Sequence, residues 1–333
     1  MTGSTARITT AAVVISLMAA LAAKAATGQW ARRAVRPAWR TRRDIARPPV
    51  PPALPPGRVM NLPGRGEVFV RDSGGTSGSP AVLLLHGWTV SADLNFFAAY
   101  AGLAESYRVI ALDLRGHGRG MRSIEPFSLE DCADDAAVLL EQLEAGRVIV
   151  VGYSMGGPVG LLLARRHREQ VAAVVMQATA LEWRRAVRER AVWRLLPVLD
   201  LSLRFGAGAG FAERVLRQAV KGDPEIADYR PWLAAEFRRA TARDLVAAGR
   251  ALSRYDARPW ADQLDVPAAM LVTTRDRLVR PAKQRELAKA LRAAVLEIDA
   301  DHDLPLVNGH EYGRLTRLAV DNVALAAGIA PAR

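Results

Sequence analysis

The sequence predicts an α/β fold in which a mostly parallel, doubly wound sheet carries a helical cap insertion. Three observations predict it. From residue 58 onward, short unbroken apolar runs alternate with segments of helical periodicity. Apolar runs without polar alternation are typical of strands buried on both faces of a parallel sheet. Between residues 181 and 254 only helical patterns remain, and 333 residues suffice for one large domain with such an insertion.

The chain begins with a hydrophobic segment over residues 1–30. Residues 8–23 carry no charge, but about twenty apolar residues are needed to span a bilayer, so this is a marginal span. Three interpretations remain open: an uncleaved anchor with Trp30 at the interface, a signal peptide with an A-x-A-like site at residues 23–25, or a helix lying on the membrane surface. Of these, the uncleaved anchor is favoured.

Residues 31–57 are predicted to form a linker between this segment and the folded core. Seven arginines fall between residues 32 and 47, and six prolines fall between residues 48 and 56. Clustered arginines resist translocation, so we expect membrane association with the domain on the cytoplasmic face. The prolines fix the backbone and remove donors, which makes the second half of the linker a stiff spacer.

The net charge of +12 is unevenly distributed along the chain. Residues 1–50 hold nine basic residues and one acidic residue, and residues 181–254 hold fifteen basic and nine acidic residues. This distribution does not suit a nucleic-acid-binding groove on the main domain, so no nucleic-acid partner is expected. It suits two segments near an anionic surface such as a membrane. The single cysteine, Cys132, excludes an internal disulfide and is interpreted as a small residue packed in a helix.

The core is predicted in two parts, residues 58–180 and 255–333, with the cap at residues 181–254 between them. Near the start of the core, two alternating stretches predict an antiparallel strand pair joined by the turn from Gly64 to Gly66. Buried strands are expected within residues 81–87, 108–116, 147–154, 171–179 and 267–276. Helices are expected at residues 94–104, 129–143, 155–166 and 282–291, which implies right-handed crossovers between the strands. The glycine-rich stretch 204–211 is expected to be a hinge within the cap.

The apolar run that starts at Val148 ends in Ser154, which lies between Gly152 and Gly156. In an open α/β sheet, ligands bind beyond the carboxyl ends of the strands. A sharp strand-to-helix turn there crowds the backbone, so glycines on both sides of the serine leave it exposed and strained, as a nucleophile needs to be. The following helix directs its amide groups and its positive dipole end toward negative charge formed at the site.

Three further pieces fall where acyl chemistry would need them. Asp276 follows one predicted strand, and His302 follows the next. The backbone N–H groups of Trp88 and Met155 could form a two-donor oxyanion hole. His310 is a rival to His302 as the base, but it lies more than a dozen residues beyond the strand, where a last helix is expected to begin.

From about residue 58 onward, the chain resembles the α/β-hydrolase superfamily with a cap after the sixth strand. The resemblance is carried by His86-Gly87, the stretch DLRGHG at residues 113–118, the stretch GYSMGG at residues 152–157, Asp276 and His302. It implies that Ser154 is the nucleophile, His302 the general base and Asp276 the acid that orients it. A serine at this position differs from the aspartate of relatives that open epoxides or displace halides, so those activities are not expected.

The resemblance implies a serine ester hydrolase of the esterase or lipase type that works through an acyl-enzyme and needs no metal or organic cofactor. The basic cap with Trp183, Trp193 and Trp232 motivates lipophilic esters, including lipids, as substrates. His86 is expected to shape the oxyanion loop, and Asp113 to tie the DLRGHG turn together with its neighbours. The alternatives are a thioesterase or perhydrolase variant of the same site, and a non-catalytic binding protein that keeps the fold.

Overall fold

A computed structural model of the chain describes residues 54–75, 80–204, 224–239 and 241–330. The predicted hydrophobic segment, almost all of the predicted linker and nearly all of the predicted glycine hinge in the cap lie outside these residues. No helix in the described part of the chain combines the length and the hydropathy that crossing a bilayer requires.

Eight strands form a single sheet in the order β1-β2-β4-β3-β5-β6-β7-β8. The β1–β2 pair is antiparallel and the pairs from β4 to β8 are parallel, as predicted, while β2 also pairs antiparallel with β4. The strands are β1 (Gly57–Leu62), β2 (Gly66–Asp72), β3 (Ala81–Leu85), β4 (Arg108–Leu112), β5 (Val148–Tyr153), β6 (Val171–Gln177), β7 (Ala268–Thr273) and β8 (Ala294–Ile298). Every residue of β3, β5 and β6 is buried, because both faces of the sheet are covered.

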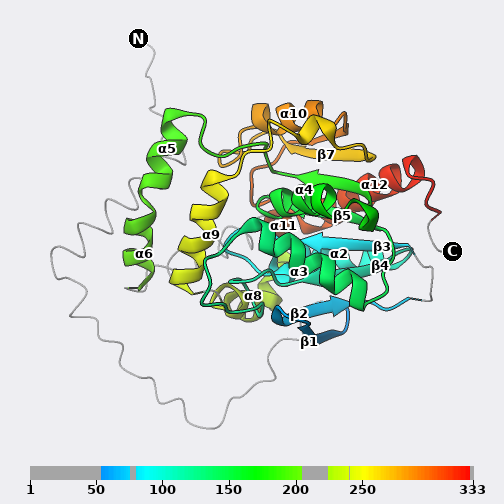
Figure 1. The fold of residues 1–333 in the computed structure, drawn as a ribbon, viewed down its shortest axis with the longest axis horizontal. Coiled ribbons are helices and arrows are strands. Elements are labelled where there is room, and N and C mark those ends of the chain that lie inside the picture. Colours follow the sequence, from blue (N-terminus) through cyan, green and yellow to red (C-terminus); the bar gives the residue numbers. More distant parts are fainter. Residues whose placement is uncertain (1–53, 76–79, 205–223, 240, 331–333) are drawn as a thin grey trace, which may run out of the picture.

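Helices cover the two faces of the sheet and form two hydrophobic cores (Figure 1). One core contains side chains of α3, α4 and α10, and the other contains side chains of α2 and α12. These helices are α2 (Ala92–Ala104), α3 (Leu129–Gln142), α4 (Gly156–Arg166), α10 (Pro281–Ala290) and α12 (Gly309–Ala326), with the short helix α11 (Leu304–Val307) before the last. The predicted doubly wound α/β fold is confirmed.

Two boundaries differ from the expectation by a few residues. Helix α2 begins at Ala92 rather than Leu94, because the hydroxyl of Ser91 caps it and accepts a hydrogen bond from the Leu94 N–H. The core begins before residue 58, since β1 starts at Gly57 and Leu54 already packs against the core.

The residues between β6 and β7 form a helical layer beyond the carboxyl ends of the strands (Figure 1). The layer contains α5 (Val187–Arg194), α6 (Leu196–Arg204), α8 (Arg230–Phe237) and α9 (Ala242–Arg254), with a 3-10 turn at Pro224–Tyr229. Its two ends meet where Glu182 pairs with Asp256 in an isolated antiparallel bridge and the Ala257 N–H donates to the Leu181 carbonyl at 2.8 Å. The insertion therefore leaves and re-enters the core at one place, as a cap does.

Hydrogen bonds and ring contacts fasten the cap to the loop that follows β3. The indole N–H of Trp88 donates to the Leu245 carbonyl of α9 at 2.8 Å, and its ring lies 5.7 Å from that of Trp193. On α8, the buried Glu236 accepts a 2.9 Å hydrogen bond from the Ser91 hydroxyl. The cap is thus held directly over the loop that follows β3.

Candidate active site

Ser154 lies in the turn between β5 and α4 with a positive φ of 52°, a strained conformation for a residue other than glycine. Its N–H donates to the Gln177 carbonyl at 2.9 Å, which holds the turn against β6. The turn also requires Gly156, because a Cβ there would lie 1.9 Å from the Leu85 carbonyl oxygen. A Cβ at Gly152 would lie 2.5 Å from the Gly156 carbonyl oxygen. The turn is therefore so tight that neither of these two positions has room for a side chain.

His302 follows β8 and reaches the serine from the neighbouring loop. Its Nε2 lies 3.0 Å from Ser154 Oγ, and its Nδ1 lies 2.8 Å from Asp276 Oδ2. The Tyr153 hydroxyl donates to the His302 carbonyl at 2.7 Å, which fixes the loop from the residue next to the serine. Three side chains that are far apart in the sequence thus form one hydrogen-bonded chain.

The Asp276 side chain is fully buried at the end of this chain, and its carboxylate accepts several hydrogen bonds besides that of His302. Its Oδ1 accepts from the Leu278 and Val279 N–H groups at 2.9 and 2.8 Å. Its Oδ2 also accepts from the Thr273 hydroxyl at 2.9 Å and the Gln284 amide at 3.2 Å. Such a set of donors holds the carboxylate at a fixed position. The sequence analysis missed Thr273 and Gln284, although Thr273 ends the strand just before the aspartate.

The electrostatic surroundings favour the protonated form of His302. Burial lowers the pKa of its imidazole, but the charge and hydrogen bond of Asp276 and the charges of Asp301 and Asp303 outweigh burial. The result is a pKa above the ordinary value for histidine. An imidazolium at this position is therefore stabilised.

The loop after β3 lies close to the serine. A Cβ added at Gly87 would lie 3.3 Å from the Ser154 Cβ, and the Gly87 N–H is already bonded to the Asn95 amide oxygen at 2.9 Å. By contrast, the backbone N–H groups of Trp88 and Met155 donate to no other group in the described residues. One free N–H donor thus belongs to the residue after Ser154, and the other belongs to the loop after β3. No sequence motif marks Asn95, whose amide oxygen occupies the Gly87 N–H.

His86 connects this loop to the DLRGHG turn. Its Nε2 accepts a 2.9 Å hydrogen bond from the Leu114 N–H, so its Nδ1 carries the proton and donates to the Gly87 carbonyl at 2.7 Å. Complete burial lowers the pKa of the imidazole and keeps it neutral. His86 therefore has the structural role that the sequence suggests.

The buried carboxylate of Asp113 organises the rest of the turn. It accepts from the Ala92 N–H at 2.8 Å and from the Arg119 N–H at 2.7 Å, and it forms an ion pair with the Arg119 side chain. Burial, followed by the nearby imidazole of His86, lowers the pKa of His117 to about 3, and its Nδ1 donates to the Arg115 carbonyl at 3.0 Å. These contacts fix the turn beneath the cap.

The rival His310 lies elsewhere. It is exposed in the first turn of α12, and it has no contact with Ser154 or Asp276. Among the described residues, no group of three or more histidine, cysteine, aspartate or glutamate side chains is arranged to hold a metal ion.

Comparisons with known proteins agree with this architecture. Residues 80–195 match the model of a protein family whose description is alpha/beta hydrolase fold. The pimeloyl-[acyl-carrier protein] methyl ester esterase of Chromobacterium violaceum is 30% identical over 224 residues, which cover 65% of this chain and 84% of that protein. The 3-oxoadipate enol-lactonase 2 of Acinetobacter baylyi is 25% identical over 60% of this chain and 73% of that protein.

Other matches cover less sequence or show the fold alone. The dihydrolipoyllysine-residue acetyltransferase component of the acetoin cleaving system of Pseudomonas putida is 36% identical over 108 residues, and the chain spans only 28% of that protein. The solved enol-lactonase of Burkholderia xenovorans LB400 superimposes with a TM-score of 0.67 over 78% of this chain and 98% of its own length, at 24% identity. Together, the sequence matches and the site geometry show that this chain is an enzyme and that it belongs to the α/β-hydrolase family.

Proposed function

We propose that this ester-hydrolysing α/β-hydrolase cleaves carboxylic esters with Ser154 as nucleophile, His302 as general base and Asp276 as the group that orients the base. The observation that carries the proposal is the hydrogen-bonded chain from Ser154 Oγ through His302 to Asp276, with distances of 3.0 and 2.8 Å. The relatives named above support ester cleavage as the reaction class.

In the first step, Ser154 Oγ attacks the ester carbonyl carbon while its proton passes to His302 Nε2. The imidazolium that forms is stabilised by the buried Asp276 carboxylate, and it then gives its proton to the leaving alcohol as the ester C–O bond breaks. In the second step, His302 takes a proton from water, and the water oxygen attacks the acyl-enzyme. The acid leaves, and Ser154 recovers its proton.

The negative oxygen of each tetrahedral intermediate needs donors that are already in place. We assign this role to the Trp88 and Met155 N–H groups, which have no other acceptor among the described residues. One donor to such an oxygen contributes about 3–4 kcal/mol to transition-state stabilisation. Because Asn95 occupies the Gly87 N–H, the loop presents the next amide along the chain.

The cap supplies an apolar surface beside this donor pair. The Trp88 ring lies 5.7 Å from that of Trp193, and a Cβ added at Gly249 would lie 2.8 Å from Trp88 and 3.1 Å from Leu196. An acyl chain bound over Ser154 would therefore lie near aromatic and aliphatic side chains. This supports esters with a lipophilic acyl group as substrates.

A panel of p-nitrophenyl esters from acetate to decanoate tests both the reaction and the preference. We expect hydrolysis by the full chain, with kcat/KM rising with acyl length by about tenfold for every two buried methylene groups, since each contributes about 0.8 kcal/mol. A fluorophosphonate probe should label the native protein and not Ser154→Ala. Higher kcat/KM for acetate than for longer esters would contradict the lipophilic preference, and equal labelling of both proteins would contradict the nucleophile.

Perhydrolysis is a second candidate reaction for the same acyl-enzyme. The bifunctional esterase/perhydrolase DCH of Acinetobacter calcoaceticus is 34% identical over 116 residues, which cover 33% of this chain. In this reaction hydrogen peroxide replaces water as the attacking group and releases a peracid. Adding hydrogen peroxide to the ester assay and measuring peracid distinguishes the two products.

The acid limb of the pH–rate profile is expected to depend on Asp301. Activity requires neutral His302, so it should fall as the pH drops through the raised pKa of the imidazole. Asp301→Asn removes one of the charges that raise this pKa, while the side-chain oxygen of the asparagine can still accept the hydrogen bond from the backbone N–H of His302. The acid limb of kcat/KM should therefore move to lower pH.

The matched control is Asp299→Asn, which removes an exposed carboxylate paired with Arg275. This substitution should leave the acid limb of kcat/KM at the same pH as in the wild type. An unchanged limb in Asp301→Asn, or an equal shift in both variants, would contradict the electrostatic account. The measurement is kcat/KM for one aryl ester across the pH range.

A further inference from the structure

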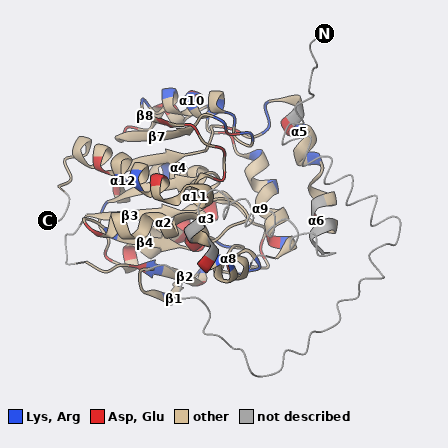
Figure 2. Cartoon of the chain, turned by 180° about the vertical axis from the view of Figure 1, so that it is seen from behind, with Lys and Arg blue, Asp and Glu red and all other residues tan. Residues whose placement is uncertain are grey.

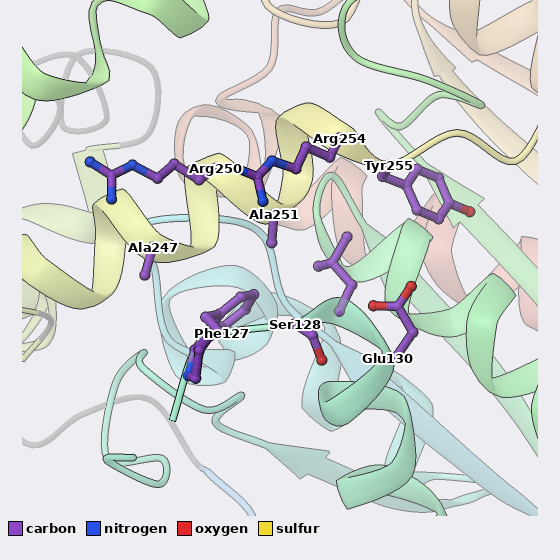
Figure 3. A pocket seen from close by; sticks show the side chains of 10 residues that line it. Phe127, Ser128, Glu130, Ala247, Arg250, Ala251, Arg254 and Tyr255 are labelled. Atoms are coloured by element: carbon purple, nitrogen blue, oxygen red, sulfur yellow. The ribbon is translucent and has the colours of Figure 1, made fainter. Parts of the chain in front are cut away.

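A cavity of about 470 Å³ lies between helix α9 of the cap and the loop that leads into α3 (Figure 3). None of its lining residues belongs to the Ser154–His302–Asp276 chain. The lining consists of Pro126, Phe127, Ser128, Leu129, Glu130, Ala247, Arg250, Ala251, Arg254 and Tyr255. Its volume falls in the range that small-molecule sites occupy.

The two walls of this cavity differ in character. On α9, the small side chains of Ala247 and Ala251 leave room, while Arg250 and Arg254 lie one turn apart along the same helix (Figure 3). On the opposite wall, Phe127 and Leu129 supply apolar surface, and Ser128 and Glu130 supply polar groups. The cavity therefore offers an apolar space with cationic groups at its edge.

The two arginines are not neutralised by the protein. Within the described residues, neither the Arg250 nor the Arg254 guanidinium forms an ion pair or a hydrogen bond. Other arginines in the molecule are paired, such as Arg166, which pairs with Asp134 at 2.9 Å. Figure 2 shows the basic residues along α9. Two free guanidinium groups beside an apolar cavity favour an anion that also carries an apolar body.

The charges of the cavity indicate where the anionic group of a ligand would lie. Glu130 lies on the wall opposite the arginines and carries one negative charge, so the local net charge is one positive unit. Glu130 repels any anion, so the anionic group of a ligand is expected at the arginine edge, with its apolar body over Phe127 and Leu129. We propose that this cavity is a second binding site, separate from the site at Ser154, for an amphipathic anion such as a fatty carboxylate.

Calorimetric titration of the full chain tests the proposal with three probes that share one apolar tail. Octanoate should bind, 1-octanol should bind about tenfold or more weakly because it lacks the charge, and octyl phosphate should bind at least as tightly as octanoate because it carries more negative charge. The double variant Arg250→Gln/Arg254→Gln should lose about tenfold or more in octanoate affinity. Ala251→Phe keeps both charges but fills the cavity, and it should abolish octanoate binding.

The matched control is Arg243→Gln, which removes the same charge from an exposed position in the first turn of α9, outside the cavity. It should leave octanoate affinity unchanged, and thermal unfolding should establish that each variant is folded. The arginines are exposed, so their variants remain informative even where Ala251→Phe fails to fold. Octanoate binding weaker than about 1 mM, equal affinity for octanol, or affinity unaffected by the arginine variants would overturn the proposal.

Discussion

Replacing either Ser154 or His302 with alanine is expected to lower kcat for aryl ester hydrolysis by about 10⁴- to 10⁶-fold. Ser154→Ala removes the attacking oxygen, and His302→Ala removes the group 3.0 Å away that accepts its proton. The double variant should be no slower than either single variant, because the two residues act as one unit in the same step. Single-turnover and steady-state rates with one p-nitrophenyl ester provide the measurement.

His310→Ala is the matched control for His302→Ala, because it removes the same side chain from the exposed first turn of α12. It should retain most of the wild-type kcat. Retained activity in His302→Ala together with lost activity in His310→Ala would show that His310, and not His302, is the base. Activity close to that of wild type in both variants would show that neither imidazole takes the serine proton.

Gly156→Ala is expected to lower the free energy of unfolding by more than about 3 kcal/mol. The added Cβ would lie 1.9 Å from the carbonyl oxygen of Leu85 and 3.0 Å from that of His86, and both are backbone atoms of the adjoining strand and loop. No side-chain rotation can relieve this contact, so β3 and α4 must separate. Since Ser154 lies in the same turn, the remaining folded protein should also lose activity. Urea denaturation monitored by circular dichroism measures the change.

Gly102→Ala is the matched control, because it makes the same substitution in helix α2, where no atom lies within 4 Å of the added Cβ. It should stabilise the protein by about 0.5–1 kcal/mol, the usual gain when alanine replaces glycine within a helix. An unfolding free energy for Gly156→Ala close to that of wild type would mean that the turn can widen. The steric account of this glycine would then be incorrect.

The buried apolar runs of the sequence predict much of the fold. Continuous burial of β3, β5 and β6 agrees with runs that lack polar alternation, because such runs can be satisfied only between two helical layers. Helix α2 begins two residues before the start that the sequence predicts. Its first turn carries Asp93 and Asn95, whose buried polar contacts interrupt the hydrophobic periodicity.

The supports of the site could not be predicted from local patterns. Gln284 lies eight residues beyond Asp276, and Asn95 lies eight residues beyond Gly87, yet each forms a buried hydrogen bond with its partner. The cap contact between Glu236 and Ser91 spans 145 residues. Polar residues like these look the same in a sequence whether they face solvent or a buried acceptor. Only the packing of helices against strand ends decides which of the two occurs.

By itself, the sequence determined the order of strands and helices, the place of the cap and the strand-to-helix turn at Ser154, because each depends on residues adjacent in the chain. The tertiary structure alone decided that His302 rather than His310 lies within 3.0 Å of the serine oxygen and that Arg250 and Arg254 border a cavity. Those distances depend on how the parallel strands align their carboxyl ends and on where the cap is fastened. Such long-range contacts leave no periodic signal in the chain.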